Sequence, residues 1–396
     1  MPKVRCETDG TEFDAKQRYC SLCGELLMVG RGVGGYEVER ILGQGGMGRV
    51  YLARHNEIGK LAALKVLDGA DPTAESYQRF VREARVGASL RSPERVDVIN
   101  FGVEEIAGRP LPWMLMEYVD GHDLSVGLGP GRTLAPSRVQ RVATSVARLL
   151  DEAHGRGIYH RDLKPANIFV AGAPPDETFK VGDFGIALVT LAPTLTSPGI
   201  IPGTLPYMSP EALRGDDLDA RSDLYSLGVV LYELLTGVRP FTGSTSGEIS
   251  YRILCVAPDP PSARVSAAEV ADWDALILRL LSKDPGDRVP SAAALLAELR
   301  SLERVHIQVW NTKWNLDKEF REAATVTLET LREKALDAAQ PPPGVYIRGD
   351  GFQYDWELAG YGALPREHLT LGDLVRILPG VTPLRLHIGG AVRYLG

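Results

Sequence analysis

The sequence has 396 residues, of which 44% are hydrophobic and 24% are charged, and its formal net charge is −7. This length predicts two or three domains with a sizeable core. The acidic balance argues against non-specific nucleic-acid binding, which needs a basic surface. No apolar run approaches the roughly 20 residues that span a bilayer, and the start of the chain lacks the apolar core of a signal peptide. We therefore expect a cytoplasmic protein without a membrane span.

Three of the four cysteines lie near the start of the chain, which indicates metal chemistry rather than a disulfide scaffold. Cys20 and Cys23 have the C-x-x-C spacing of one half of a zinc ribbon. The other half would come from Cys6 and Asp9, with a carboxylate in place of the fourth thiolate. Two alternatives follow. Either three cysteines and an aspartate bind Zn²⁺, or the knuckle is degenerate and binds no metal.

The first region of the chain, residues 1–31, is therefore expected to be a zinc-ribbon-like segment. It ends in the glycine-rich run 30–35, which predicts a flexible joint. The remaining cysteine, Cys255, lies far from the other three in the sequence. We expect it to be a buried structural residue.

A glycine-rich turn follows this joint. Two strands are predicted at 36–42 and 50–53, and Gly43, Gly45 and Gly48 lie between them. Because glycine lacks a Cβ, such a backbone can approach a phosphate closely and direct successive N–H groups at it. A plain hairpin is the alternative. A dinucleotide-binding turn is excluded, because a strand rather than a helix follows.

The next strand and helix carry a lysine and a glutamate. Lys65 lies on a strand predicted over 61–67. The helical spacing of Tyr77, Phe80 and their apolar neighbours predicts a helix that carries Glu83. A strand lysine alone is usually a solvated charge, but a Lys–Glu pair would fix the ammonium so that it can hold phosphate oxygens.

Two polar motifs follow a long amphipathic helix. In the first, Asp162, Lys164 and Asn167 lie within six residues. In the second, Asp183 begins the triplet Asp-Phe-Gly after a further predicted strand. Phosphoryl transfer needs these residue types: an acid to accept the hydroxyl proton, a cation to neutralise the transferred group, and oxygen ligands for Mg²⁺.

The glycine turn, strand lysine, helix glutamate and the two polar motifs occur in the order and at the separations that resemble the protein kinase family. The resemblance extends over residues 36–302. It implies an α+β, bilobal protein-kinase fold. The β-rich N-lobe would occupy 36–118 and the helical C-lobe 121–302.

The resemblance also implies roles for the matching positions. Asp162 would be the catalytic base, and Lys164 would contact the γ-phosphate of ATP. Lys65 would hold the α- and β-phosphates, and Glu83 would fix its ammonium. The residues implied to contact ATP are Leu42, Gly43, Gly45, Gly48, Val50, Ala63, Lys65, Met116, Glu117 and Val119.

Metal-binding and structural roles follow in the same way. Asn167 and Asp183 would bind Mg²⁺, with Mn²⁺ as an alternative metal. Glu211 and Arg288 resemble the family's structural ion pair. Asp223 resembles the carboxylate that braces the catalytic loop. We expect these last three residues to be structural and not catalytic.

The resemblance favours an ATP-dependent serine/threonine protein kinase, similar to the eukaryotic-like kinases of bacteria. Lys164 is typical of the Ser/Thr branch, in which Thr204 would hydrogen-bond to the catalytic Asp and Lys. The partners would be protein substrates. The alternative is a pseudokinase scaffold that binds ATP and partners without transfer. It predicts loss of the residues that chemistry needs, but Lys65, Asp162 and Asn167 are all present.

The activation segment carries candidate phosphorylation sites. Arg161 precedes the catalytic aspartate, and in the family this arginine often pairs with a phosphate on the segment. We expect autophosphorylation at Thr194, Thr196 or Ser197, with a homodimer as one arrangement for it; a merely polar, flexible loop is the alternative.

The last region, residues 305–396, is expected to be a separate α+β module of unknown role. A helix is predicted over 316–339. Strands are predicted at 306–314, 345–347, 352–358 and 384–388.

Overall fold

In the computed structural model the chain forms two compact units, Met1–Ala294 and Leu295–Gly396, and each unit is described by itself. The described residues are 3–8, 10–14, 16–45, 48–67, 75–174, 176–184, 204–265, 268–302, 304–311, 316–323, 331, 353–358, 362–363 and 384–391. No helix within these ranges is both long enough and apolar enough to cross a bilayer.

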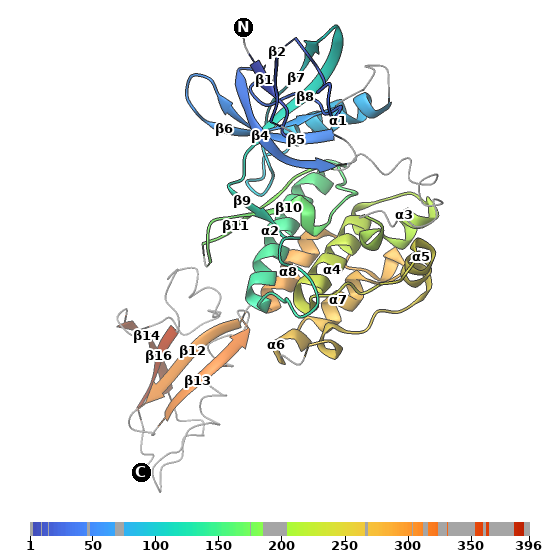
Figure 1. Ribbon diagram of the computed structural model, residues 1–396. Helices are drawn as coiled ribbons and strands as arrows, with labels where there is room; N and C mark the ends of the chain where they lie inside the picture. Colours follow the sequence, from blue (N-terminus) through green and yellow to red (C-terminus); the bar gives the residue numbers. More distant parts are fainter. Residues whose placement is uncertain are drawn as a thin grey trace, which may run out of the picture. The chain divides into compact units, whose positions relative to one another are not determined.

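A six-stranded sheet dominates the N-terminal part of the first unit (Figure 1). Its strand order is β3-β4-β5-β6-β8-β7, and all neighbours are antiparallel. The elements are β3 (Gly32–Val33), β4 (Tyr36–Gly45), β5 (Gly48–His55), β6 (Leu61–Val66), α1 (Glu75–Ser89), β7 (Val98–Ile106) and β8 (Arg109–Glu117). The strands predicted around the glycine turn, the lysine strand and the glutamate helix are thereby confirmed.

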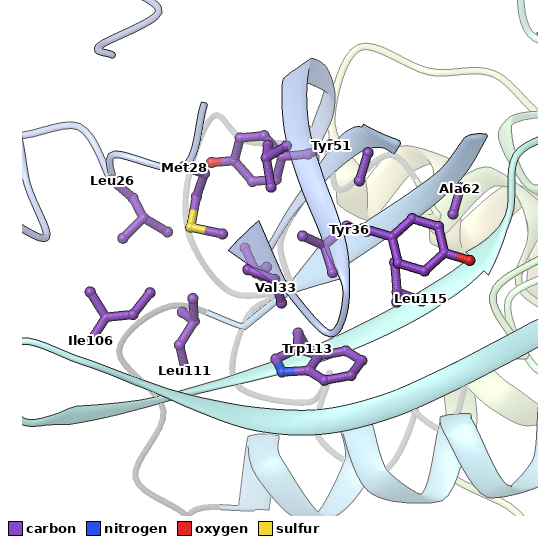
Figure 2. Close-up of a cluster of buried hydrophobic side chains, with 14 residues drawn as sticks. Leu26, Met28, Val33, Tyr36, Tyr51, Ala62, Ile106, Leu111, Trp113 and Leu115 are labelled. Carbon is purple, nitrogen blue, oxygen red and sulfur yellow. The ribbon is translucent and has the colours of Figure 1, made fainter. Parts of the chain in front are cut away.

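The N-terminal segment packs on this sheet. It contains the two-stranded antiparallel sheet of β1 (Lys3–Arg5) and β2 (Glu12–Asp14). Leu26 and Met28 are buried in one apolar cluster with Tyr51 of β5 and Leu111 of β8 (Figure 2). The shared core removes the apolar surface of both parts from water. The segment is thus an integral layer of the N-lobe.

A buried arginine adds polar contacts to this packing. Arg18 is only 4% exposed, and its guanidinium donates hydrogen bonds to the carbonyl oxygens of Ile106 (3.2 Å) and Arg109 (3.0 Å). These carbonyls belong to the β7–β8 hairpin. Hydrogen bonds offset the cost of burying a guanidinium, so these two contacts help to fix the position of the segment on the hairpin.

The predicted flexible joint over 30–35 is wrong. Gly32 and Val33 form strand β3, and Val33 is 1% exposed within the apolar cluster. Gly34 and Gly35 have φ values of 56° and 85°. Two successive residues at positive φ close a tight hairpin turn, a task for which glycine is suited. The glycines therefore serve a turn and not a loose linker.

Helices form most of the C-lobe (Figure 1). Helix α4 is buried along almost its whole length, as its apolar sequence predicts. Cys255, at the end of α5, is predicted to be buried, but it is exposed. The buried face of α5 is formed by Ile249 and Ile253 instead. The helices are α2 (Pro136–Gly155), α3 (Pro210–Arg214), α4 (Ala220–Thr236), α5 (Ser246–Cys255), α6 (Ala268–Ala271) and α7 (Asp274–Leu280), and α8 (Ala292–Leu302) contains the boundary between the two units.

A small three-stranded sheet of order β11-β10-β9 completes the C-lobe. Its strands are β9 (Gly121–Asp123), β10 (Ile168–Ala171) and β11 (Thr178–Val181). Strand β10 pairs antiparallel with both neighbours. The hairpin of β10 and β11 positions the two polar motifs, because one motif precedes β10 and the other follows β11.

The second unit contains a five-stranded sheet of order β13-β12-β16-β14-β15. The strands are β12 (Arg304–Asn311), β13 (Leu316–Ala323), β14 (Gln353–Leu358), β15 (Gly362–Ala363) and β16 (Leu384–Ala391). The strands predicted around β12, β14 and β16 are confirmed, and the one at 345–347 lies outside the described residues. The helix predicted from Leu316 is wrong over β13. There, strand pairing with β12 overrides the helix propensity of Glu, Lys and Ala.

Candidate active site

The glycine-rich turn closes the hairpin of β4 and β5. Gly43 pairs with Val50 and Gly45 with Gly48, and the tip residues 46–47 lie outside the described ranges. Gly48 has a φ of 136°, and a Cβ there would lie 2.1 Å from the carbonyl oxygen of Val66 on β6. A side chain would collide with this backbone, so the position requires glycine.

Apolar residues from neighbouring strands lie beside this hairpin. Ala63 on β6 pairs with Met116 on β8. Ala63 is buried, whereas Leu42 at the base of the turn is exposed. Met116 lines a small pocket together with Glu83 and Phe184.

The end of β8 is held in place by a lysine, Lys180, for which the sequence predicts no role. The backbone N–H of Glu117 donates to the carbonyl oxygen of Asp97 at 2.8 Å. The carboxylate of Glu117 lies 2.8 Å from Nζ of Lys180 on β11. Val119 follows and is partly buried. This ion pair links the segment between the two lobes to the small C-lobe sheet.

The lysine of β6 meets two carboxylates. Lys65 Nζ lies 2.7 Å from Glu83 Oε1 and 2.9 Å from Asp183 Oδ1. Burial by itself lowers the pKa of Lys65. The negative charges of Asp183 and Glu83 have the larger effect and raise this pKa above its ordinary value, so the Lys65 side chain is a protonated ammonium. Burial raises the pKa of Asp183, but the ammonium more than compensates and holds it below its ordinary value. Asp183 is thus an ionised carboxylate.

The loop before β10 gathers an acid, an ammonium, an amide and a hydroxyl. Lys164 Nζ lies 2.7 Å from Asp162 Oδ2 and 3.0 Å from Thr204 Oγ1. Asn167 Nδ2 donates to the backbone oxygen of Asp162 at 2.7 Å and to its Oδ2 at 3.2 Å. The other oxygen, Asp162 Oδ1, makes no hydrogen bond to the residues that the structure describes. It is therefore available to accept a proton from an incoming group.

A buried aspartate on α4 supports this loop. Asp223 accepts hydrogen bonds from the backbone N–H groups of His160 and Arg161, both at 2.8 Å. His154 Nε2 lies 2.8 Å from the same carboxylate. Arg161 has a φ of 64°, a strained value for a residue with a side chain. The carboxylate thus stabilises the backbone bend that positions Asp162.

The two polar motifs are also tied to each other. His160 Nε2 lies 3.1 Å from the carbonyl oxygen of Gly182, and its ring lies 4.7 Å from that of Phe184. The N–H of Gly182 donates to the carbonyl oxygen of Asn167 at 2.9 Å. The loops of Asp162 and Asp183 therefore share one site.

The predicted structural ion pair forms deep in the C-lobe. Arg288 donates from Nη1 to Glu211 Oε1 at 2.7 Å and from Nη2 to Glu211 Oε2 at 2.8 Å. Ser222 also donates to Oε1 at 2.6 Å. Burial on its own raises the pKa of Glu211, but hydrogen bonds from Arg288 and Ser222 lower it to about 2. A two-pronged pair of this kind fixes the end of the segment that follows Thr204.

The three N-terminal cysteines lie close together in space. The Sγ atoms of Cys6, Cys20 and Cys23 all lie within 4.8 Å of one another, and those of Cys6 and Cys23 are 3.4 Å apart. Sulfurs bound to one tetrahedral Zn²⁺ at about 2.3 Å would be about 3.8 Å apart, so the cluster fits a thiolate metal site. Asp9 lies outside the described residues.

The family model of the protein kinase domain matches residues 36–299. The chain therefore belongs to the protein kinase family. The predicted fold, with a sheet-rich N-lobe and a helical C-lobe, is confirmed. A crystal structure of the PknI kinase domain of Mycobacterium tuberculosis matches with a TM-score of 0.53 and 32% identity, over 69% of this chain and 98% of that one.

Curated relatives extend this result. The chain is 38% identical over 353 residues to serine/threonine-protein kinase pkn3 of Myxococcus xanthus, which covers 87% of this chain and 60% of the relative. It is 42% identical over 276 residues to serine/threonine-protein kinase PknB of Mycobacterium tuberculosis, which covers 68% of this chain and 43% of the relative. The chain thus spans about half the length of these relatives.

Proposed function

We propose that the chain transfers the γ-phosphoryl group of ATP to serine or threonine hydroxyls of protein substrates. The observation that carries the proposal is the meeting of two charge clusters in one site. Lys65, Glu83 and Asp183 form one cluster, and Asp162 and Lys164 belong to the other. Relatives named serine/threonine-protein kinases support the same reaction and the same acceptor class.

The acceptor hydroxyl would approach Asp162. Because Lys164 and Asn167 hold Oδ2, the orientation of the carboxylate is fixed and Oδ1 can accept the hydroxyl proton. Lys164, also held by Thr204, would stabilise the negative charge on the transferred group. Little covalent chemistry is required of the protein, so positioning and charge compensation would supply most of the rate.

Nucleotide would bind between the glycine hairpin and the small C-lobe sheet. Lys65 would hold its phosphates, and the pair with Glu83 keeps this ammonium in place. Mg²⁺ or Mn²⁺, when bound, would neutralise the negative charge of the phosphates. Asn167 and Asp183 fit as its ligands, because the amide nitrogen of Asn167 donates to Asp162 and leaves the amide oxygen for a metal.

The activation segment between Asp183 and Thr204 is proposed to be autophosphorylated at Thr194, Thr196 or Ser197, by one copy of a homodimer acting on the other. These residues lie outside the described ranges. Nε of Arg161 is buried and makes no hydrogen bond within the described part of the chain, so its guanidinium has donor capacity for a phosphate. Mass spectrometry after incubation with ATP and Mg²⁺ tests this; an unmodified segment in active enzyme contradicts it.

A Zn²⁺ site at Cys6, Cys20 and Cys23 is proposed as a second, structural feature of the protein. Sulfur spacing supports it. Asp9, which stands at the same distance from Cys6 as Cys23 from Cys20 in the sequence, is the proposed fourth ligand.

Labelled ATP tests the proposed reaction directly. The wild-type chain is incubated with a generic protein acceptor and Mg²⁺, and the Asp183→Ala variant serves as the inactive comparison. We expect label on serine and threonine with the wild type only. Nucleotide binding without transfer by the wild type would instead indicate a scaffold, and label on tyrosine would contradict the acceptor class.

A further inference from the structure

The two turns that carry the cysteines have matching backbone geometry. In the first, the N–H of Gly10 donates to the carbonyl oxygen of Cys6 at 3.0 Å. In the second, the N–H of Gly24 donates to the carbonyl oxygen of Cys20 at 2.9 Å. Both glycines have a φ of 75°, which suits glycine alone without steric cost. Two equivalent knuckles therefore direct their sulfurs to one point, and metal occupancy would fix both.

The residue that follows Cys6 contacts the first strand of the glycine hairpin. Oε1 of Glu7 accepts a hydrogen bond from the backbone N–H of Ile41 at 2.7 Å. Ile41 lies on β4 two residues before Gly43, next to a shift in the pairing of β4 and β5. A side chain of the first knuckle thus holds the strand where it enters the phosphate-binding turn.

The residue that follows Gly24 contacts the second strand. Oε1 of Glu25 lies 3.5 Å from Nη1 of Arg49, and both side chains are largely shielded from water. Arg49 pairs with Gln44 across the turn. Oε2 of Glu25 accepts a hydrogen bond from the hydroxyl group of Thr8, which lies in the first knuckle two residues after Cys6. One carboxylate therefore connects the sulfur cluster to the hairpin.

We propose that metal occupancy of the cysteine cluster regulates ATP binding through the glycine hairpin. This rests on the proposed Zn²⁺ and nucleotide sites. A bound metal would fix Cys6, and with it the neighbouring Glu7 and Thr8, whose hydroxyl group holds Glu25. Both strands of the hairpin would then be anchored in the position that covers the nucleotide. Without metal the two anchors would loosen and the hairpin would lose order.

The coupling can be measured by binding alone. Zinc content of the full chain is determined, and the Kd of a non-hydrolysable ATP analogue is measured by titration calorimetry with Mg²⁺, before and after a zinc-selective chelator. We expect one zinc per chain and about a five-fold weaker Kd after its removal, the lower end of typical coupling between two sites. Linkage requires that the analogue tighten zinc binding by the same factor.

Variants separate the anchors from the metal. The double variant Glu7→Ala, Glu25→Gln keeps the cysteines, so it is expected to retain zinc. It should bind the analogue about five-fold more weakly than the wild type and should not respond to the chelator. Glu12→Gln is the matched control, because Glu12 lies in the same segment but pairs with exposed Lys3. It should behave as the wild type does.

Each failure has a distinct signature. An unchanged Kd after verified zinc loss overturns the regulation and leaves the metal site standing. Absence of bound zinc overturns both the metal site and the inference. Loss of the whole thermal unfolding transition on chelation also overturns the inference, because the metal would then hold the fold and not the hairpin. Failure of phosphoryl transfer leaves the binding measurement unaffected.

Discussion

Lys65 Nζ and Asp183 Oδ1 lie 2.9 Å apart, although 118 residues separate them in the sequence. The first belongs to the N-lobe sheet and the second to the loop that follows β11. Glu83 on α1 contacts the same ammonium at 2.7 Å. Because one cation joins a strand, a helix and a loop, correct placement of α1 is a condition for a complete site.

Glu83→Gln tests this condition. The amide keeps the shape of the side chain but removes one of the two carboxylates that face Lys65. We expect kcat/KM for ATP to fall about 10-fold or more, a loss of at least about 1.4 kcal/mol of transition-state stabilisation. Steady-state kinetics with varied ATP measure it. Glu39→Gln is the control, because Glu39 forms an exposed pair with Arg54 on the same sheet. Equal kinetics for the two variants would contradict the role of Glu83.

Asp162→Asn tests the proposed base. The amide can still hydrogen-bond to Lys164 or the acceptor, but it cannot take up the hydroxyl proton. Loss of general base catalysis typically costs 10²- to 10⁴-fold, so we expect kcat to fall by about that factor while the Kd for nucleotide changes little. Asp151→Asn, at an exposed position on α2, is the control. A kcat of the Asp162→Asn variant near the wild-type value would rule out this assignment.

The site could largely be predicted from the sequence because its chemistry is carried by short motifs. Each motif holds its polar groups at fixed separations, and phosphoryl transfer requires those groups together. The predicted pair of Lys65 with Glu83 and that of Glu211 with Arg288 are both confirmed. Lys180, which holds Glu117, could not be found in this way, because a lone strand lysine carries no local signal.

The errors share a different cause. Leu316–Ala323 has the composition of a helix, but in the structure it pairs with β12. Helix propensity is a local property of the sequence and does not include such a tertiary contact. Gly34 and Gly35 read as a linker because the burial of Val33 beside them depends on residues far along the chain. Arg18 gave no signal at all, since only the fold brings the carbonyls of β7 and β8 to it.

Gly48→Ala tests the close approach of the glycine hairpin to β6. The added Cβ would lie 2.1 Å from the carbonyl oxygen of Val66. The alanine backbone would also have to adopt a φ of 136°. Strained backbone of this kind costs about 1–3 kcal/mol, so we expect a lower free energy of unfolding and a lower Tm without nucleotide. Gly43→Ala is the matched control, because a Cβ there meets no atom within 4 Å. Equal stability of the two variants would argue against this packing.

Arg288→Ala tests the ion pair with Glu211 in the C-lobe. The substitution leaves a carboxylate buried without its cation, which typically costs 3–5 kcal/mol, so we expect a loss of about that size in the free energy of unfolding. Arg252→Ala is the control, because Arg252 forms a partly exposed pair with Glu248. Such pairs are worth about 0–1 kcal/mol. Urea unfolding followed by circular dichroism measures both.

The same pair predicts how stability depends on pH. The pKa of Glu211 is about 2 in the folded protein and has an ordinary value of 4.5. Because the folded value is the lower one, this carboxylate contributes its full stability above about pH 4.5 and loses it progressively as the pH falls towards 2. Urea midpoints of the wild type should therefore drop between pH 5 and 3 more steeply than those of Arg288→Ala, in which the pKa is no longer depressed. Parallel pH profiles would show that Glu211 and Arg288 do not interact in the folded state as the 2.7 Å contact requires.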